Sequence, residues 1–250
     1  MKTRTIFCAG LIMTAGLSVI PPRAFAGTPN AGTCQGLPTE ADLRTLLQQA
    51  AQTGTYGTVG GIFEGTRMWA AVVNRDGELC AAATSTPDPS QVWPGSQAIA
   101  KAKAYTANAF SLDTFALSTA RLYTFTQPGH SLWSLGQSNL FDSQALAPPS
   151  GAGGTAEQRI TGGLIFFGGG VPLYKNGKIV GGLGVSGDTS CADHEIAKRV
   201  RDIAGMNPAG GSLADDIVYT TSVFAHPVCL NTYQNGTFVG NEAEAVYPKK

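Results

Sequence analysis

Histidines are the residues of this chain best suited to ligate a metal or a haem iron, and there are only three of them. His130 lies in an irregular stretch at residues 127–135, beside Trp133 and two leucines. Such apolar neighbours would form a wall against which a haem could rest, with the imidazole as its axial ligand. His194 follows Cys191 in the first turn of a predicted helix, where the helix dipole disfavours its cation and keeps it neutral for a metal or a hydrogen bond. Simple exposure or internal hydrogen bonding is the competing interpretation for both residues.

Two lysines and a run of glycines are candidates for lining a ligand site. Lys101 and Lys103 lie on an alanine-rich helical segment, where they either engage an acidic ligand or form a solvated face. Gly169 and Gly170, with Gly168 before them, interrupt an apolar run. Three residues without side chains there either make a β-bulge or let a flat ligand lie against the backbone.

Three further motifs give weaker indications of function than these histidines, lysines and glycines. Residues 182–187 match the dinucleotide fingerprint GxGxxG, but the strand before them belongs to a hairpin and no βαβ unit follows. Residues 187–190 lead into a helix N-terminus that would either hold a carboxylate or phosphate or be capped internally by Ser190 and Asp193. Ser186 lacks the flanking glycines of a GxSxG nucleophile elbow, so no catalytic residue is assigned.

The N-terminal 26 residues read as a secretory signal peptide, with Lys2 and Arg4 before an apolar run and small residues before Gly27. Its removal, which also takes Arg23, turns 17 basic and 17 acidic side chains into a small acidic excess. A chain without a basic excess is poorly suited to bind nucleic acid or an anionic membrane. An apolar content of 43% excludes wholesale disorder, so we expect residues 27–250 to form a single domain.

Four cysteines remain once Cys8 leaves with the signal peptide, an even number that predicts two disulfides in an oxidising compartment. Three connectivities are open. We favour Cys34–Cys80 with Cys191–Cys229, because each joins segments nearer in the chain. A four-cysteine metal site is less favoured, since the chain has no CxxC pair.

Hydrophobic periodicity and turn residues predict the elements that must position these side chains. The expected elements are helices at 37–52, 97–110 and 112–123 and one opening at Ser190, hairpins at 67–84 and 163–186, a long loop insertion at about 127–160, and a strand at 218–228 before an irregular tail. Hairpins make antiparallel strands, so the order of elements favours an α+β fold with helices packed on an antiparallel sheet over a parallel α/β fold.

Three segments together resemble the GlcG/HbpS family: the alanine- and lysine-bearing helix at 98–110, the strand pair at 169–187 and the helix start at 193–197. The resemblance covers most of residues 38–205. It implies a profilin-like three-layer α/β/α fold and oligomers. The family includes exported haem-binding proteins, some linked to redox sensing or haem breakdown, and domains that accompany corrinoid adenosyltransferases. The insertion and the four cysteines depart from its minimal pattern.

The leading hypothesis is therefore an exported, periplasmic or secreted protein that binds haem or another tetrapyrrole, in haem scavenging or redox sensing. The residues expected at its site are the candidate iron ligands His130 and His194, with Lys101, Lys103, Gly169 and Gly170. Two alternatives stay open. One is a periplasmic accessory or scaffold subunit that binds a partner enzyme and has no cofactor of its own; the other is an enzyme that acts on a small anionic metabolite at residues 187–190.

Overall fold

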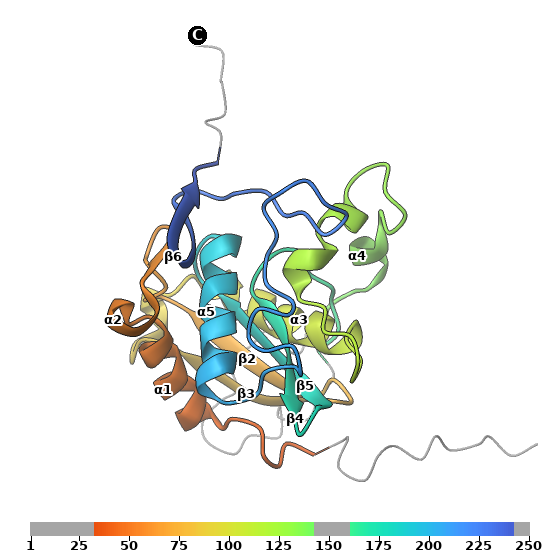
Figure 1. Ribbon diagram of the computed structural model, residues 1–250. Helices are drawn as coiled ribbons and strands as arrows, with labels where there is room; N and C mark the ends of the chain where they lie inside the picture. Colours follow the sequence, from red (N-terminus) through yellow and green to blue (C-terminus); the bar gives the residue numbers. More distant parts are fainter. Residues whose placement is uncertain (1–32, 143–160, 243–250) are drawn as a thin grey trace, which may run out of the picture.

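The structure, a computed structural model, describes residues 33–142 and 161–242 (Figure 1). The predicted signal peptide, with Cys8, and the second part of the predicted insertion lie outside the described residues. The two described ends of the insertion meet where the amide of Asp142 donates to the carbonyl oxygen of Thr161 at 2.8 Å. Within the described residues, no helix is long and apolar enough to span a membrane.

A four-stranded antiparallel sheet forms the centre of the fold, in the order β3-β2-β5-β4. Its strands are β2 (Trp69–Asn74), β3 (Leu79–Thr84), β4 (Gly170–Lys175) and β5 (Lys178–Ser186). Both predicted hairpins are confirmed. Asn176 and Gly177 both have positive φ, as the tight turn between β4 and β5 requires. The pairing of β2 with β5 joins the two hairpins into one sheet.

Helices cover both faces of this sheet, which confirms the α+β fold with three α/β/α layers. Helix α3 (Pro94–Ala109) lies on one face, while α1 (Glu40–Ala50) and α5 (Ser190–Ile203) lie side by side on the other (Figure 1). Successive side chains of β2 point to opposite faces of the sheet and so contribute to the core on each face. Ala71 and Val73 pack toward α3, and Ala70 and Val72 pack toward α1 and α5.

Side chains cap the two helices of the second layer. Thr39 and Asp42 form a reciprocal capping box at the start of α1. At the start of α5 the cap is Thr189, whose hydroxyl accepts from the amide of Ala192. The prediction that Ser190 caps this helix is therefore wrong by one residue, because Ser190 is already helical.

Three local predictions fail, the first two because side chains take up the backbone groups of the segment. Residues 112–123 form one turn of 3-10 helix at Thr119–Leu122, preceded by a loop that the Ser111 hydroxyl holds through both backbone groups of Leu117. Strand β4 begins at Gly170 rather than at 163, since the amides of Ile165 and Gly168 bind side chains.

The third failure concerns the C-terminal segment, residues 206–242. The strand predicted at 218–228 is a single bridge between Val218 and Ala225, and the tail predicted to be irregular contains β6 (Thr232–Gly240). β6 pairs antiparallel with β1 (Thr58–Gly60), which follows the short helix α2 (Thr53–Tyr56). A strand paired with a segment far away in sequence has no turn signal to reveal it.

Both predicted disulfides are present. Cys34–Cys80 fastens the segment before α1 to β3, and Cys191–Cys229 fastens the C-terminal segment to the first turn of α5. The four-cysteine metal site, the less favoured alternative, is thereby excluded for these cysteines as they stand in the structure.

Glycines on β5 allow α3 to lie directly on the sheet. A Cβ atom at Gly184 would collide with the carbonyl oxygen of Ala100 and would lie 2.9 Å from the Cβ of Lys103. Gly182 meets the backbone of α3 one turn further along, at Ala104 and Asn108. The glycine-rich run is therefore a packing surface for a helix.

We expect Gly184→Ala to lower the free energy of unfolding by about 1–3 kcal/mol or more, because the added methyl group must push α3 off the sheet. Urea denaturation monitored by circular dichroism measures this. The matched control is Gly95→Ala in the first turn of α3, where a Cβ meets nothing within 4 Å and no loss is expected. Equal unfolding midpoints for the two variants would contradict this packing argument.

Candidate functional site

A buried ion pair joins the helices on opposite faces of the sheet. Lys103 on α3 donates through Nζ to Asp193 Oδ2 of α5 at 2.7 Å and to the carbonyl oxygen of Val185 at 3.0 Å. The Lys103 and Asp193 side chains are 0% and 2% exposed. Asp193 also accepts from the amide of Asp188, and the Lys103 ammonium lies 5.0 Å from the centre of the Phe167 ring. Every polar atom of the pair thus has a partner, which a buried charge requires.

The predicted glycines belong to this cluster. Gly169 has φ +118°, and a Cβ there would lie 2.6 Å from Lys103 Nζ. Gly170 faces the Lys103 carbonyl oxygen and the Thr119 side chain, and its amide donates to the Thr119 hydroxyl at 2.8 Å. These glycines therefore make room for the lysine itself. The structure brings Lys103, Gly169 and Gly170 together around an internal carboxylate.

Burial dominates the electrostatics of the pair. It raises the pKa of Asp193 to about 6, against the opposing effect of the Lys103 charge, so the carboxyl is still ionised at neutral pH. Burial lowers the pKa of Lys103, and the carboxylate of Asp193 opposes that shift.

Lys101 lies one turn from Gln97 on the same helix and donates to its side-chain oxygen at 3.1 Å. Its side chain is also buried, and burial lowers its pKa to about 8. The solvated face that was one interpretation of Lys101 and Lys103 is therefore wrong for both lysines.

His194 is enclosed between α5 and the C-terminal segment. Its Nε2 accepts from the amide of Ile217 at 3.2 Å and lies 3.3 Å from a carboxylate oxygen of Asp216. Asp216 also pairs with Lys198 at 3.1 Å. Burial would raise the pKa of Asp216, but hydrogen bonds and charges from His194 and Lys198 outweigh it and lower the pKa well below its usual range. Nε2 of His194 is thus engaged in an internal network, Nδ1 is buried without a hydrogen-bond partner, and the residue is 1% exposed.

His226 is a buried histidine to which sequence reasoning gave no role. Its Nδ1 lies 2.7 Å from the carbonyl oxygen of Pro227, and its Nε2 accepts from the amide of Gly168. Burial lowers its pKa to about 4, so it is neutral. The signal for it was its position three residues before Cys229, a cysteine already predicted to be tied to the start of α5.

His130 stands apart from the other predicted residues, on the described part of the insertion. It is exposed, and its carbonyl oxygen accepts from the amide of Trp133 at 3.1 Å, so both residues belong to one turn. Trp133 is 50% exposed, and Leu140, beyond the short helix α4 (Leu135–Ser138), is 83% exposed. An imidazole beside exposed apolar side chains is free to meet an external ligand.

The start of α5, where an anionic metabolite was one hypothesis, is filled by the chain itself. The amide of Asp188 donates to Asp193, that of Thr189 to Asp188, and that of Ala192 to the Thr189 hydroxyl. The amide of Cys191 donates to Cys229 Sγ. Internal capping is thus what the structure shows, and these amides are not free to bind an anion.

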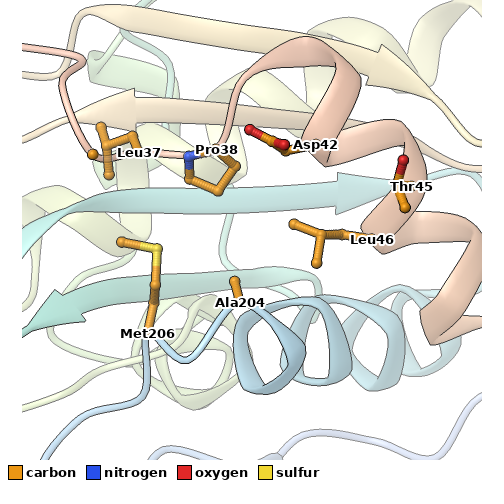
Figure 2. Close-up of a pocket in the computed structure, with 8 residues that line it drawn as sticks. Leu37, Pro38, Asp42, Thr45, Leu46, Ala204 and Met206 are labelled. Atoms are coloured by element: carbon orange, nitrogen blue, oxygen red, sulfur yellow. The ribbon is translucent and has the colours of Figure 1, made fainter.

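Three cavities among the described residues have no histidine or cysteine in their lining. The largest has a volume of about 410 Å³ and lies between the segment before α1 and the end of α5. Figure 2 shows Leu37, Pro38 and Met206 around it, with Leu46 of α1. Met206, whose sulfur is a weak ligand, is its one soft donor.

We expect Lys103→Met to lower the free energy of unfolding by about 3–5 kcal/mol, because it leaves the Asp193 carboxylate buried without its partner. Lys178→Met is the matched control: its ion pair with Asp113 has a similar length of 2.8 Å, but the two side chains are 74% and 40% exposed. That variant should lose less than about 1 kcal/mol. Comparable losses in chemical denaturation would show that the buried pair contributes no more than a surface pair.

Comparison with known proteins identifies a family model that matches this chain. The model of the haem degrading protein HbpS-like family matches residues 43–202. Solved structures that this chain is similar to include Klebsiella pneumoniae protein ORFY (21% identity, 65% of this chain and 88% of that chain, TM-score 0.43). A PduOC:heme complex has 24% identity over 68% of this chain and 92% of that chain (TM-score 0.45). An HbpS double mutant from Streptomyces reticuli has 20% identity over 73% and 98% (TM-score 0.39).

A search of individually curated proteins gave no match. The family model, in contrast, spans well over half of the sequence, from within α1 to within the last turn of α5. It contains all four strands of the central sheet, α3 and the Lys103–Asp193 ion pair. The chain therefore belongs to the HbpS-like family of haem degrading proteins.

Proposed function

We propose that this chain binds haem on an exposed apolar surface around His130, with His130 as the axial ligand of the iron. The description of the family supports haem as the ligand. We call this surface the His130 patch; its members are His130, Trp133, Phe125, Phe224 and Val223. The observation that carries the proposal is that His130 is the one exposed histidine of the three in the sequence.

The other two histidines are poor candidates because their rings are already engaged in the interior. Ligation through Nε2 of His194 would break its contact with Asp216 and the amide of Ile217. Ligation through Nδ1 would require the protein to open, because this nitrogen is buried and the residue is 1% exposed. Ligation of a haem by His226 would require the protein to open beside the disulfide, where the ring is 3% exposed. Each opening would uncover buried polar groups at a cost in free energy.

The patch supplies the other features that a haem needs. Phe125 and Phe224 pack edge to face at 5.7 Å, which joins the segment just before the insertion to the C-terminal segment. Val223, next to this pair, is 61% exposed and extends the apolar surface. The Arg121 guanidinium lies 5.9 Å from the centre of the Phe224 ring, at the edge of the patch, where it can pair with a propionate. In the turn of His130, the amide of Leu132 donates to the carbonyl oxygen of Phe125 at 2.9 Å. The axial donor, the flat apolar side chains and the cation therefore lie on segments that contact one another.

In this proposal the predicted site residues that are buried support haem binding by stabilising the fold that carries the patch. Lys103, Gly169 and Gly170 fix α3 and the sheet, and His194 fixes the C-terminal segment that carries Phe224. A bound haem would supply an iron able to exchange electrons, as redox sensing or haem breakdown requires. We extend the proposal to an exported protein, supported by two disulfides that suit an oxidising compartment.

Titration of the oxidised protein with haemin tests the site. We expect a Soret shift at micromolar haemin for the wild type, and about tenfold or weaker affinity for His130→Ala because the iron loses its axial ligand. Trp133→Ala should weaken binding while retaining the histidine-ligated spectrum. The control is Gln137→Ala, an exposed polar residue of the same segment, with unchanged affinity.

Unaltered haem binding by His130→Ala would overturn the assignment of the ligand. A wild-type protein that shows no Soret shift and instead co-purifies with a stable partner would overturn haem binding and support the accessory subunit. The two results are distinguishable because the first keeps the coloured complex and the second lacks it.

A further inference from the structure

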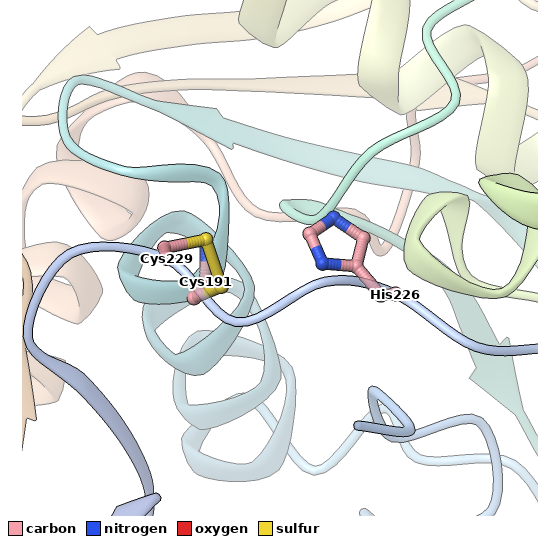
Figure 3. Close-up of side chains that lie close together, drawn as sticks. All are labelled: Cys191, His226 and Cys229. Atoms are coloured by element: carbon pink, nitrogen blue, oxygen red, sulfur yellow. A yellow bond between two sulfur atoms is a disulfide. The ribbon is translucent and has the colours of Figure 1, made fainter. Parts of the chain in front are cut away.

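Cys191, Cys229 and His226 form a compact group of potential metal ligands in the interior (Figure 3). Their ligand atoms all lie within 4.8 Å of one another. The three residues are 2%, 7% and 3% exposed. Within residues 33–142 and 161–242 this is the single group of three such residues with that spacing.

The two sulfur atoms are joined in a disulfide, so any metal chemistry must follow its reduction. The surroundings of Cys229 favour the thiolate that reduction would create. Its Sγ accepts from the amide of Cys191 at 3.2 Å and lies 3.3 Å from the Ser190 hydroxyl. Both groups belong to the first turn of α5, a helix of 14 residues whose dipole also stabilises negative charge.

His226 is held in the form that a metal ligand needs. Its Nδ1 lies 2.7 Å from the carbonyl oxygen of Pro227, an acceptor that assigns the ring proton to Nδ1 and the lone pair to Nε2. That lone pair now accepts a hydrogen bond of 3.2 Å from the amide of Gly168. Donation of the second ring nitrogen to a backbone carbonyl is the usual way in which proteins orient a ligating histidine.

We propose that reduction of the Cys191–Cys229 disulfide turns this cluster into a site with two cysteines and one histidine for a thiophilic d10 cation such as Zn²⁺. A dithiol reductant transfers two electrons and two protons to the disulfide, which becomes two thiols while the reductant becomes a disulfide. Binding of Zn²⁺ then releases both thiol protons as the thiolates ligate the metal. Water completes the fourth position, as in other zinc sites with three protein ligands.

Charge balance explains why a divalent cation fits this interior. Two thiolates neutralise Zn²⁺, and the neutral imidazole adds no charge, so the loaded site buries no net charge. Thiolate and imidazole ligands select Zn²⁺ or Cu⁺ over Mg²⁺ or Ca²⁺, which prefer oxygen. The metal would also replace the covalent link between α5 and the C-terminal segment, so that this segment stays in place in both redox states.

The disulfide lies close enough to the surface for a reductant to reach it from the C-terminal segment. Leu230, next to Cys229, is 51% exposed, and Pro227 is exposed as well. These residues form one short stretch over the start of α5, and displacing it uncovers Cys229 without disturbing the sheet.

The test is an anaerobic titration of the full chain with Co²⁺, a spectroscopic probe for zinc sites, after reduction by a phosphine. We expect one Co²⁺ per chain with a sulfur-to-cobalt charge-transfer band, displaced by Zn²⁺, and no band in the oxidised protein. Cys191→Ser/Cys229→Ser should abolish the band, whereas Cys34→Ser/Cys80→Ser, which removes the other disulfide, should keep it. His226→Gln should weaken the affinity about tenfold or more.

Circular dichroism of each sample shows whether the protein is folded, so that each outcome either supports or overturns the proposal. A reduced wild type that is folded but shows no sulfur-to-cobalt band overturns the proposal, and so does a band that persists in Cys191→Ser/Cys229→Ser. If reduction unfolds the chain, Zn²⁺ must restore the native spectrum, and failure to do so also overturns it. The haemin titration uses the oxidised protein, so either proposal can fail without the other.

Discussion

The ion pair between Lys103 and Asp193 is the constraint on which the rest of the structure depends. It joins α3 and α5, which lie on opposite faces of the sheet, and it also engages the carbonyl oxygen of Val185 at the end of β5. Two charges can be buried here only because Gly169 leaves the space that Lys103 occupies, and Gly184 lets the whole helix approach. The glycine-rich strands and the charged helices thus form one packing arrangement.

The C-terminal segment covers α5 and so determines which groups remain accessible. Lys198 pairs with Asp216 and Arg201 pairs with Asp215, and both of these α5 cations are almost fully buried. Removing one partner from such pairs leaves an uncompensated charge, so the cover is held by many mutually dependent contacts. The Cys191–Cys229 disulfide fastens it at the helix start. The His130 patch combines Phe224 and Val223 of this cover with Phe125 and His130 from an earlier part of the chain.

Much of the fold could be predicted because its signals are local. Asp76-Gly77 and Asn176-Gly177 mark the hairpins, and apolar spacing marks α1, α3 and α5, each within a few residues. The prediction failed at 112–123, where the Ser111 hydroxyl binds the backbone of Leu117. It also failed at 163–169 and 218–228, where the side chains of Thr106, His226 and Thr124 bind the backbone from distant positions. Periodicity carries no information about such partners. Strand β6 was not predicted for the same reason, since its partner β1 lies more than 150 residues earlier.

The sequence by itself determined the class of fold, the expectation of two disulfides, the family and the set of side chains with the right chemistry, whereas the structure decided among the three possible cysteine pairings. Only the tertiary structure decided which of these side chains face a ligand. It buries Lys101, Lys103 and His194, leaves His130 exposed, and places His226 beside the Cys191–Cys229 disulfide. The physical reason is that a residue type fixes what a group can donate, accept or ligate. Its burial and its partners come from chain segments that meet only when the protein folds.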